Sequence, residues 1–195
     1  QLQYLKDNGY STLTLNEIYD FIINHKCIPE KSVALTFDDG YNDNYTNAFP
    51  LIKEYGYKAT VFVVTNWIDK EGYPYINSEH LKEMDAAGMD IESHTLNHDH
   101  LPTLSYDKQL ETLKNSKKYL ESLLNKKVNF IGYPFGEEDE NTIKAAKTAG
   151  YTMGFLSYGK WADENQGTYT LARVYISSYF DINEFAKRIS NTDYN

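Results

Sequence analysis

Short apolar segments alternate with longer amphipathic segments along this chain, and this alternation limits the folds it can adopt. Six runs rich in β-branched and aromatic residues have the length of strands. They cover residues 33–37, 59–64, 89–92, 128–133, 152–155 and 171–176. Alternating strands and helices predict an α/β fold with a mostly parallel sheet. An open doubly wound sheet and a closed barrel both satisfy this pattern.

The segments between these runs carry helix start and stop signals. Thr14 with Glu17, and Asp181 with Glu184, have the spacing of capping boxes that open helices. Pro50 lies inside another helical segment, so that helix is expected to be kinked or to start late. The expected helices cover residues 14–25, 44–55, 78–87, 105–125 and 139–149, and a last one starts at 181.

Length, charge and cysteine content exclude several classes of protein. The 195 residues predict one domain, 1–195, with residues 1–30 as a helical lead-in. A net charge of -9 argues against a nucleic acid partner, because phosphates are neutralised by basic surfaces. No apolar run reaches the roughly 18 residues of a membrane span, so no membrane insertion is expected within this chain. The single cysteine, Cys27, excludes an internal disulfide.

The sequence TFDDG at residues 36–40 places two adjacent acids directly after an expected strand. Neighbouring side chains on an extended segment point in opposite directions, so Asp38 and Asp39 are expected to meet different partners. One of them can bind a metal while the other accepts a proton. The alternative is an ordinary solvated turn, since Asp and Gly are common turn residues.

The sequence SHTLNH at residues 93–98 favours the metal interpretation. It follows the expected strand 89–92 and places His94 and His98 four residues apart. On a helical turn this spacing brings two imidazoles to one side, as in zinc-binding histidine pairs. Together with an acid from another strand end they predict a His-His-Asp site with open positions, which is typical of a catalytic metal. His100 is expected to be an exposed neighbour.

Two further strand ends supply candidates for the same site. In IGYPFG, residues 131–136, Pro134 fixes its own backbone, so the following amide of Phe135 can be held as an oxyanion donor. Arg173 is one of only two arginines and lies on the expected strand 171–176. A buried arginine needs a carboxylate partner, so we expect Arg173 to face one of the site acids.

Aromatic residues are abundant, with 18 tyrosines and 2 tryptophans. Flat amphipathic rings suit core packing and also stacking on sugar rings. Core packing is the ordinary role for any one of them. The candidates for contact with a sugar are Tyr133, Pro134, Trp67 and Trp161, with Tyr73 and Tyr75 as additional platforms.

Taken together, TFDDG, HTLNH at 94–98 and YPFG at 133–136 resemble the first three motifs of the polysaccharide deacetylases, the NodB-homology domain of carbohydrate esterase family 4. The resemblance covers roughly residues 31–176. It implies a distorted (β/α) barrel of about seven parallel strands. It also implies one divalent metal bound by Asp39, His94 and His98, with Asp38 as the catalytic base.

The opening segment of the chain, residues 1–22, also resembles the segment that precedes this domain in bacterial cell-surface members, including those that act on poly-N-acetylglucosamine. The chain starts without Met and lacks the pattern of a signal peptide, so we expect a leader or anchor to be missing. A polymeric substrate implies an extracellular or cell-surface location.

The sequence departs from the family pattern at two positions. Many members have an arginine where Gly132 stands, and that arginine orients the base; our hypothesis is that Arg173 does so here. The family's late Leu-x-His motif, which supplies a general acid, has no counterpart, because the last histidine is His100. Either water or an unassigned residue then protonates the leaving amine, or the rate is low, since a missing general acid can cost about 100- to 10,000-fold.

The function that these motifs imply is metal-dependent hydrolysis of N-acetyl groups on an N-acetylglucosamine-containing polysaccharide or oligosaccharide by a monomeric enzyme. Zinc is the first expectation for the metal, with cobalt or nickel as alternatives, because two histidines and one carboxylate accept several ions. An O-acetyl esterase acting on xylan is a second interpretation. A carbohydrate-binding relative with little or no turnover is a third.

Overall fold

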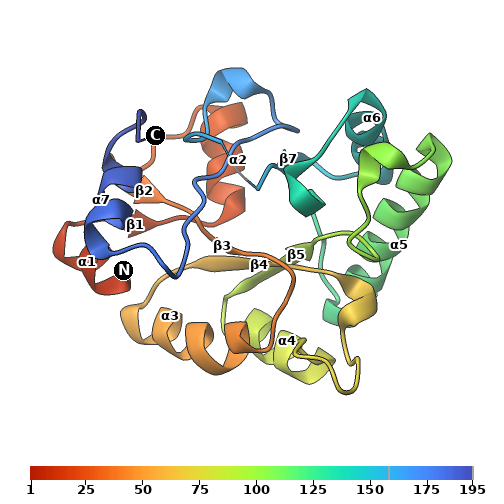
Figure 1. Ribbon diagram of the computed structural model, residues 1–195, viewed down its shortest axis with the longest axis horizontal. Helices are drawn as coiled ribbons and strands as arrows, with labels where there is room; N and C mark the ends of the chain where they lie inside the picture. Colours follow the sequence, from red (N-terminus) through yellow and green to blue (C-terminus); the bar gives the residue numbers. More distant parts are fainter. Residues whose placement is uncertain (158, 195) are drawn as a thin grey trace.

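A curled parallel sheet of five strands forms the centre of the molecule (Figure 1). The computed structural model describes residues 1–157 and 159–194. The strand order is β3-β4-β5-β6-β7, so each strand lies beside the next one in sequence. The strands are β3 Leu35–Phe37, β4 Ala59–Val63, β5 Asp90–Ser93, β6 Phe130–Gly132 and β7 Met153–Phe155. This half-barrel confirms the predicted α/β class and distorted barrel.

A second, smaller sheet pairs β1, Ser11–Thr12, with β2, Ser32–Val33, and these strands are also parallel. The single strand expected over residues 33–37 is therefore divided. Its first part pairs with β1, whereas its second part, β3, pairs with β4. The described residues thus hold seven parallel strands, but in two sheets rather than one closed ring.

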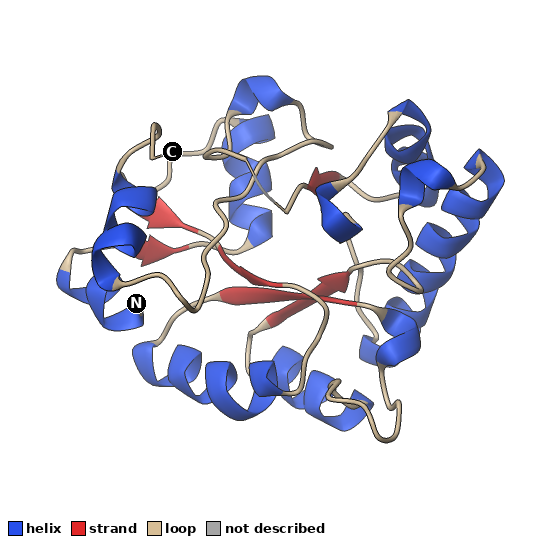
Figure 2. Ribbon diagram, in the orientation of Figure 1, coloured by secondary structure: helices blue, strands red, loops and turns tan. Residues whose placement is uncertain are grey.

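Helices cover the outside of the sheet (Figure 2). In Figure 1, α3 and α4 lie along one side and α5 and α6 along the adjacent side, while α1 and α7 lie beside the small sheet. The bounds are α1 Leu2–Asp7, α2 Leu15–Asn24, α3 Phe49–Tyr55, α4 Ser78–Ala86, α5 Tyr106–Leu124, α6 Glu140–Ala149 and α7 Ile182–Ser190. None of the helices in the described part of the chain is long and apolar enough to cross a membrane.

The predicted caps explain where several helices begin. The Thr14 side chain accepts from the Glu17 amide and Glu17 reaches back to the Thr14 amide, which completes the capping box of α2. Asp181 caps α7 by accepting from the amides of Asn183 and Glu184, but the Glu184 side chain accepts from Arg188, so only the Asp181 half of the predicted capping box is found in the described residues. Pro50 stands in the first turn of α3, after a π-helical turn at Asn44–Ala48, so that helix starts late. Neither α1 nor β1 was predicted as a separate element.

The expected strand over residues 171–176 was wrong. Only Leu171 forms a bridge, to Phe155 at the end of β7, and the chain continues as irregular structure. The neighbouring strand β7 is itself only three residues long, Met153–Phe155. The segment nevertheless runs between the two edge strands of the sheet. Leu171 pairs with Phe155 of β7, and Arg173 contacts Thr36 of β3.

The hydrophobic core has two parts. The larger part lies between the sheet and α3 to α6, and the smaller part fills the inside of the curled sheet beneath α2. Every residue of β4 is buried, as expected for a parallel strand covered on both faces. The inner part consists of Leu15, Phe62, Phe130, Met153, Phe155 and Leu171.

Candidate active site

Parallel register brings the predicted site residues to one edge of the sheet. Phe37, at the end of β3, lies opposite Val61 of β4, and Ser93, at the end of β5, lies between Val63 and Ile131. The residues that follow β3, β5 and β6 therefore emerge at the same edge. In a parallel α/β sheet the carboxyl ends of the strands are where binding and catalytic groups gather.

Asp38 and Asp39 face different partners, as the sequence predicts. Asp38 contacts Arg173, whereas Asp39 contacts two histidines. The backbone reason differs from the one expected, because β3 ends at Phe37 and Asp39 is left-handed, with φ of 71°. A left-handed residue turns the chain sharply, and Gly40 follows it with φ of 75°. The turn, rather than strand alternation, separates the two carboxylates.

Asp39, His94 and His98 form a compact group of metal-binding atoms. Oδ1 of Asp39 lies 3.3 Å from Nε2 of His94 and 3.2 Å from Nε2 of His98. One ligand atom from each residue lies within 4.8 Å of the others. Burial would raise the pKa of the Asp39 carboxyl, but the contacts with the two imidazoles hold it well below its usual value. These three side chains are a donor set that fits a divalent transition metal.

His94 is fixed from the core side. Its side chain is 2% exposed, and its Nδ1 donates to the carbonyl of Gly132 at 2.7 Å. That bond leaves Nε2 as the free ligand atom, which is how a metal-binding histidine is usually oriented. A Cβ at Gly132 would lie 3.2 Å from Nδ1 of His94 and 3.0 Å from Phe62. Glycine at this position therefore allows the close approach of β6 to the histidine.

His98 lies on an irregular loop, so the predicted helical turn was wrong. Thr95 and His98 both have positive φ, 71° and 62°, and the Thr95 hydroxyl accepts from the His98 amide. Two left-handed residues bring His98 back over His94, which is four positions earlier. Its ring stacks on Trp67 at 5.4 Å and meets Phe135 edge to face at 4.5 Å. Aromatic contacts thus surround this second imidazole.

Arg173 contacts Asp38 through two parallel hydrogen bonds. Nη1 and Nη2 each lie 2.7 Å from one carboxylate oxygen. Nε donates to the Leu156 carbonyl and Nη1 also donates to the Thr36 hydroxyl, so the guanidinium joins the segment after β7 to β3. Burial would raise the pKa of Asp38, but the charge and hydrogen bonds of Arg173 oppose it, and the pKa is lowered overall. Asp38 is therefore ionised at neutral pH.

Phe135 has an unusual backbone and an unpaired amide. Its φ is 60° and its ψ is 1°, in a short turn directly after β6. Within the described residues, the amides of Gly136 and Glu137 donate to Tyr133 and Pro134, whereas that of Phe135 has no hydrogen-bond acceptor. An amide in this state can bind an oxyanion. The role predicted for Phe135 stays a prediction.

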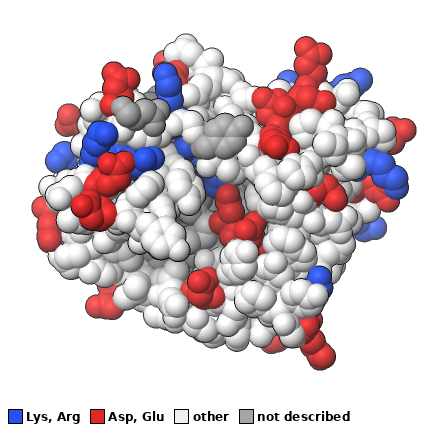
Figure 3. Space-filling model, viewed as in Figure 1, with Lys and Arg blue, Asp and Glu red and all other residues white. Residues whose placement is uncertain are grey.

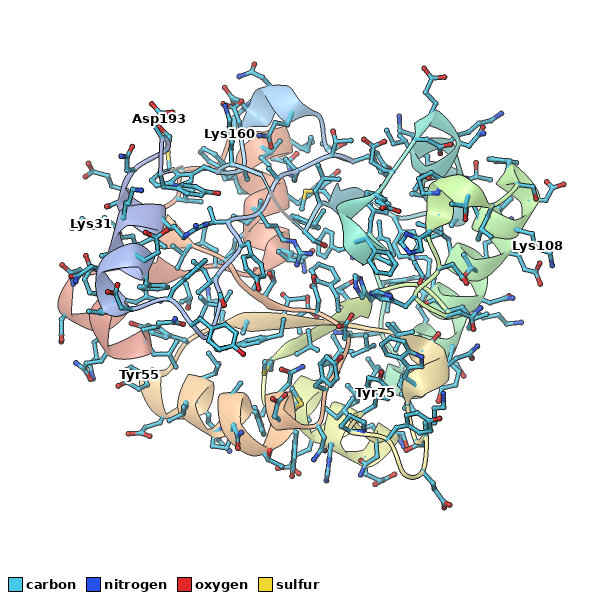
Figure 4. The ribbon with its side chains drawn as sticks, in the orientation of Figure 1. Lys31, Tyr55, Tyr75, Lys108, Lys160 and Asp193 are labelled. Atoms are coloured by element: carbon cyan, nitrogen blue, oxygen red, sulfur yellow. The ribbon has the colours of Figure 1, made fainter. Side chains whose placement is uncertain are left out.

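The predicted sugar contacts do not all lie at this edge. The Tyr133 side chain is fully buried and packs against Gly154, and Pro134 is also buried. Trp161 donates to the Arg188 carbonyl and packs near α7. Lys160, its neighbour in sequence, lies far from Tyr75 in Figure 4. The roles predicted for Tyr133, Pro134 and Trp161 as sugar contacts stay predictions.

Trp67 and the tyrosines that follow it form an aromatic row beside His98. Trp67 stacks on Tyr75 at 4.3 Å, and Tyr75 lies 5.3 Å from Tyr41 and 6.3 Å from Tyr73. Tyr41 and Tyr73 are exposed. Figure 3 shows that the face viewed is hollowed near its middle, with acidic groups beside the hollow and most basic groups toward the rim.

The contacts of His100 were not predicted from the sequence. Its Nδ1 donates to Oε2 of Glu137 at 2.7 Å, and its ring stacks on Phe135. The side chain is 52% exposed, as expected. Because Glu137 is 37 residues away, no local pattern could have indicated this pair.

The polysaccharide deacetylase family model matches residues 25–154 of this chain. Among curated proteins, YxkH of Bacillus subtilis (strain 168) is 40% identical over 176 residues, which are 90% of this chain and 62% of that protein. A poly-beta-1,6-N-acetyl-D-glucosamine N-deacetylase of Staphylococcus aureus is 31% identical over 192 residues, or 91% of this chain and 65% of that protein. The chain thus spans somewhat under two thirds of the length of these relatives.

Solved structures give the same result for the fold. The Streptococcus pyogenes deacetylase PplD, solved in complex with acetate, has a TM-score of 0.92 and 32% identity, over 97% of this chain and 84% of that one. IcaB from Ammonifex degensii has a TM-score of 0.81 and 26% identity, over 91% of this chain and 81% of that one.

Proposed function

Because this chain belongs to the polysaccharide deacetylase family, we propose that it is a metal-dependent N-deacetylase of a polysaccharide that contains N-acetylglucosamine. One observation carries the proposal: a donor set for a divalent ion, Asp39 with His94 and His98, lies directly beside an ionised Asp38. The name of the Staphylococcus aureus relative supports the choice of substrate.

The proposed metal ligands are Asp39, His94 and His98. Two imidazoles and one carboxylate fit zinc, and also cobalt or nickel, and they leave coordination positions open. When bound, such an ion lowers the pKa of water and polarises a carbonyl oxygen. His94 is prepared for this role because its Nδ1 is already engaged by the Gly132 carbonyl.

Asp38 is the proposed base. Water attacks the carbonyl carbon of the acetamido group and gives its proton to the Asp38 carboxylate, which is ionised before the reaction and so has no proton of its own. The two hydrogen bonds from Arg173 fix the plane of that carboxylate. The Phe135 amide donates to the oxyanion that forms. The carbon–nitrogen bond then breaks, and the proton held by Asp38 is available to the leaving nitrogen.

The absence of a histidine after His100 in the sequence favours a second candidate, an O-acetyl esterase acting on xylan. An alcohol leaves more readily than an amine, so ester hydrolysis depends less on a dedicated general acid. The same carboxylates and metal ligands serve both reactions. Substrate preference is therefore the first property to measure.

The substrate proposal carries a location with it. A cell-wall or capsular polysaccharide lies outside the cytoplasm, so we propose that the enzyme acts at the cell surface or outside the cell, as a monomer. On the aromatic row beside His98, Trp67 and Tyr75 are the proposed sugar contacts. Their rings adjoin the proposed metal site, where the sugar next to the reacting residue would lie.

Acetate release from defined N-acetylglucosamine oligomers, compared with acetylated xylan, tests the function. We expect release from the oligomers, loss of release after chelation, and recovery on addition of zinc or cobalt. Asp38→Asn and His94→Ala serve as inactive controls. Release from xylan alone would favour the esterase. Binding of oligosaccharide with no release from either substrate, even with metal added, would mean that the chain is a carbohydrate-binding relative.

A further inference from the structure

The ring of Phe135 is held on two sides. It stacks face to face on His100, with ring centroids 3.8 Å apart and planes within 2° of parallel. Its other contact is edge to face with His98 at 4.5 Å. The ring is nevertheless 43% exposed, so burial in the core does not fix it. The stack with His100 is the closest aromatic contact that the ring makes.

His100 is itself held by Glu137. The hydrogen bond from Nδ1 to the Glu137 carboxylate is 2.7 Å long. Glu137 stands two residues after Phe135, so the contact closes a small loop in which the imidazole lies against the phenyl ring and is tied to the same turn. A planar imidazole held by one hydrogen bond and one stacking contact has little rotational freedom.

The backbone of Phe135 needs such support. A bulky residue with φ of 60° lies in a region that residues other than glycine seldom adopt. Rotation about the N–Cα bond changes where the amide points relative to the side chain. A ring that is fixed in space, with φ fixed at 60°, therefore fixes the direction of the Phe135 amide.

We propose that His100 and Glu137 form a clamp that keeps Phe135 in its left-handed conformation and so aims its amide at the oxyanion. The inference rests on the proposed function, in which this amide is the oxyanion donor. His100 is a positioning residue and transfers no proton in this account. Without the clamp, the phenyl ring is free to move and the turn relaxes toward negative φ, which redirects the amide.

Two substitutions at His100 separate positioning from proton transfer. His100→Ala removes the stack, and we expect kcat for N-acetylglucosamine oligomers to fall about 10- to 100-fold with little change in KM, since a lost oxyanion donor costs about 100- to 1,000-fold. His100→Phe keeps a flat ring that can stack on Phe135 but loses the titratable nitrogen and the hydrogen bond to Glu137, so we expect it to recover part of that loss. A His100→Phe variant as slow as His100→Ala would overturn the clamp in favour of a proton-transfer role.

A double-mutant comparison tests the backbone step. Glycine adopts positive φ without a side-chain penalty, so in a Phe135→Gly background the further change His100→Ala should lower kcat much less than it does alone. Equal effects in both backgrounds would contradict the proposal. Glu137→Gln keeps an acceptor oxygen, so its kcat should lie between those of wild type and His100→Ala.

Zinc affinity gives a readout that is independent of turnover. We expect His100→Ala to bind zinc as wild type does, by calorimetric titration with the metal alone, because Asp39, His94 and His98 are intact. A loss of zinc affinity that matches the loss of kcat would show that His100 acts through His98 instead. An active wild type with an unaffected His100→Ala variant would refute the clamp alone, whereas an inactive wild type would refute the proposed function.

Discussion

The two histidines that meet at Asp39 are held by different parts of the molecule. His94 directly follows β5, is buried, and donates to a strand carbonyl. His98 lies on a loop, has a left-handed backbone, and is 17% exposed among aromatic rings. We call the first group, Asp38, His94 and Arg173, the strand half of the site. The second group, His98 and Phe135 with the rings around them, is the loop half.

The two halves differ in the contacts that hold their side chains in place. In the strand half, hydrogen bonds and an ion pair fix each polar group, and these contacts depend on direction as well as distance. In the loop half, ring stacking fixes the side chains, and stacking tolerates small sliding motions. We therefore expect substitutions of Asp38 and Arg173, in the strand half, to act mainly on the chemical step. Substitutions in the loop half should act in a graded way, on affinity or alignment.

The largest effect is expected from Asp38→Asn in the strand half. The amide keeps the shape of the carboxylate but cannot take a proton from water, so kcat should fall by about 100- to 10,000-fold. Zinc affinity should stay near that of wild type, because Asp39 and the histidines are unchanged. Steady-state acetate release and a zinc titration measure the two quantities. A variant with normal kcat would remove Asp38 from the chemistry.

Arg173→Lys should come next. Lysine keeps the charge but loses the two parallel hydrogen bonds to Asp38, and displacing a reacting group by about 1 Å can cost about 100-fold in rate. Arg188→Lys is the matched control, because the other arginine pairs with Glu184 on α7. We expect kcat to fall in the first variant only. Equal kcat values in both would show that Arg173 closes the sheet edge without orienting Asp38.

Trp67→Ala probes the loop half. Removing the ring that stacks on His98 frees the imidazole, and the loss of groups that orient a ligand typically weakens metal binding by about 10- to 100-fold. Trp67→Phe keeps a stacking face and should recover much of the affinity. Competition with a zinc-binding dye measures both. If the alanine variant binds zinc as tightly as wild type, aromatic packing does not hold His98 and the contrast between the halves fails.

The smallest effect is expected outside both halves, from Glu17→Gln in the capping box of α2. Hydrogen bonds from Lys58 and from the Thr14 amide lower the pKa of Glu17, so its charge stabilises the fold above that pKa and the benefit disappears as the pH falls through it. The pair is partly exposed, so the loss should be at most about 1 kcal/mol at pH 7. Urea unfolding at pH 7 and pH 3 measures the free energy of unfolding of wild type and Glu17→Gln. The difference between them should be smaller at pH 3 than at pH 7, and kcat should be unchanged.

The strand half was largely predictable from the sequence. One apolar run is followed by Asp38 and another by His94, so both residues are expected at strand ends. In a parallel sheet these ends lie at the same edge, which brings the two side chains together. The pairing of Arg173 with a site acid also followed, because a single arginine in an apolar segment needs a carboxylate. The strand predicted around Arg173 was wrong: β7 is only three residues long, and only Leu171 of the predicted strand pairs with it.

The loop half was not predictable in the same way. Thr95, His98 and Phe135 all have positive φ, which the sequence signals reliably only through glycine. The contacts of His98 with Trp67 and of His100 with Glu137 join residues 31 and 37 positions apart and follow no local period. Such contacts depend on how loops pack once the sheet exists, and neither hydrophobic spacing nor motif order contains that information.

The ion pair between Asp38 and Arg173 has a consequence for the order of events during synthesis. The two residues are 135 positions apart, and a chain emerges from the ribosome N-terminus first. Arg173 is therefore synthesised only after all five strands of the main sheet, and until then Asp38 has no guanidinium partner. Closing so long a loop comes late and costs entropy that earlier contacts must already have offset. The Asp38 carboxylate is therefore oriented only after Arg173 has been made and has reached the sheet, so a shorter nascent chain contains the base without the group that positions it.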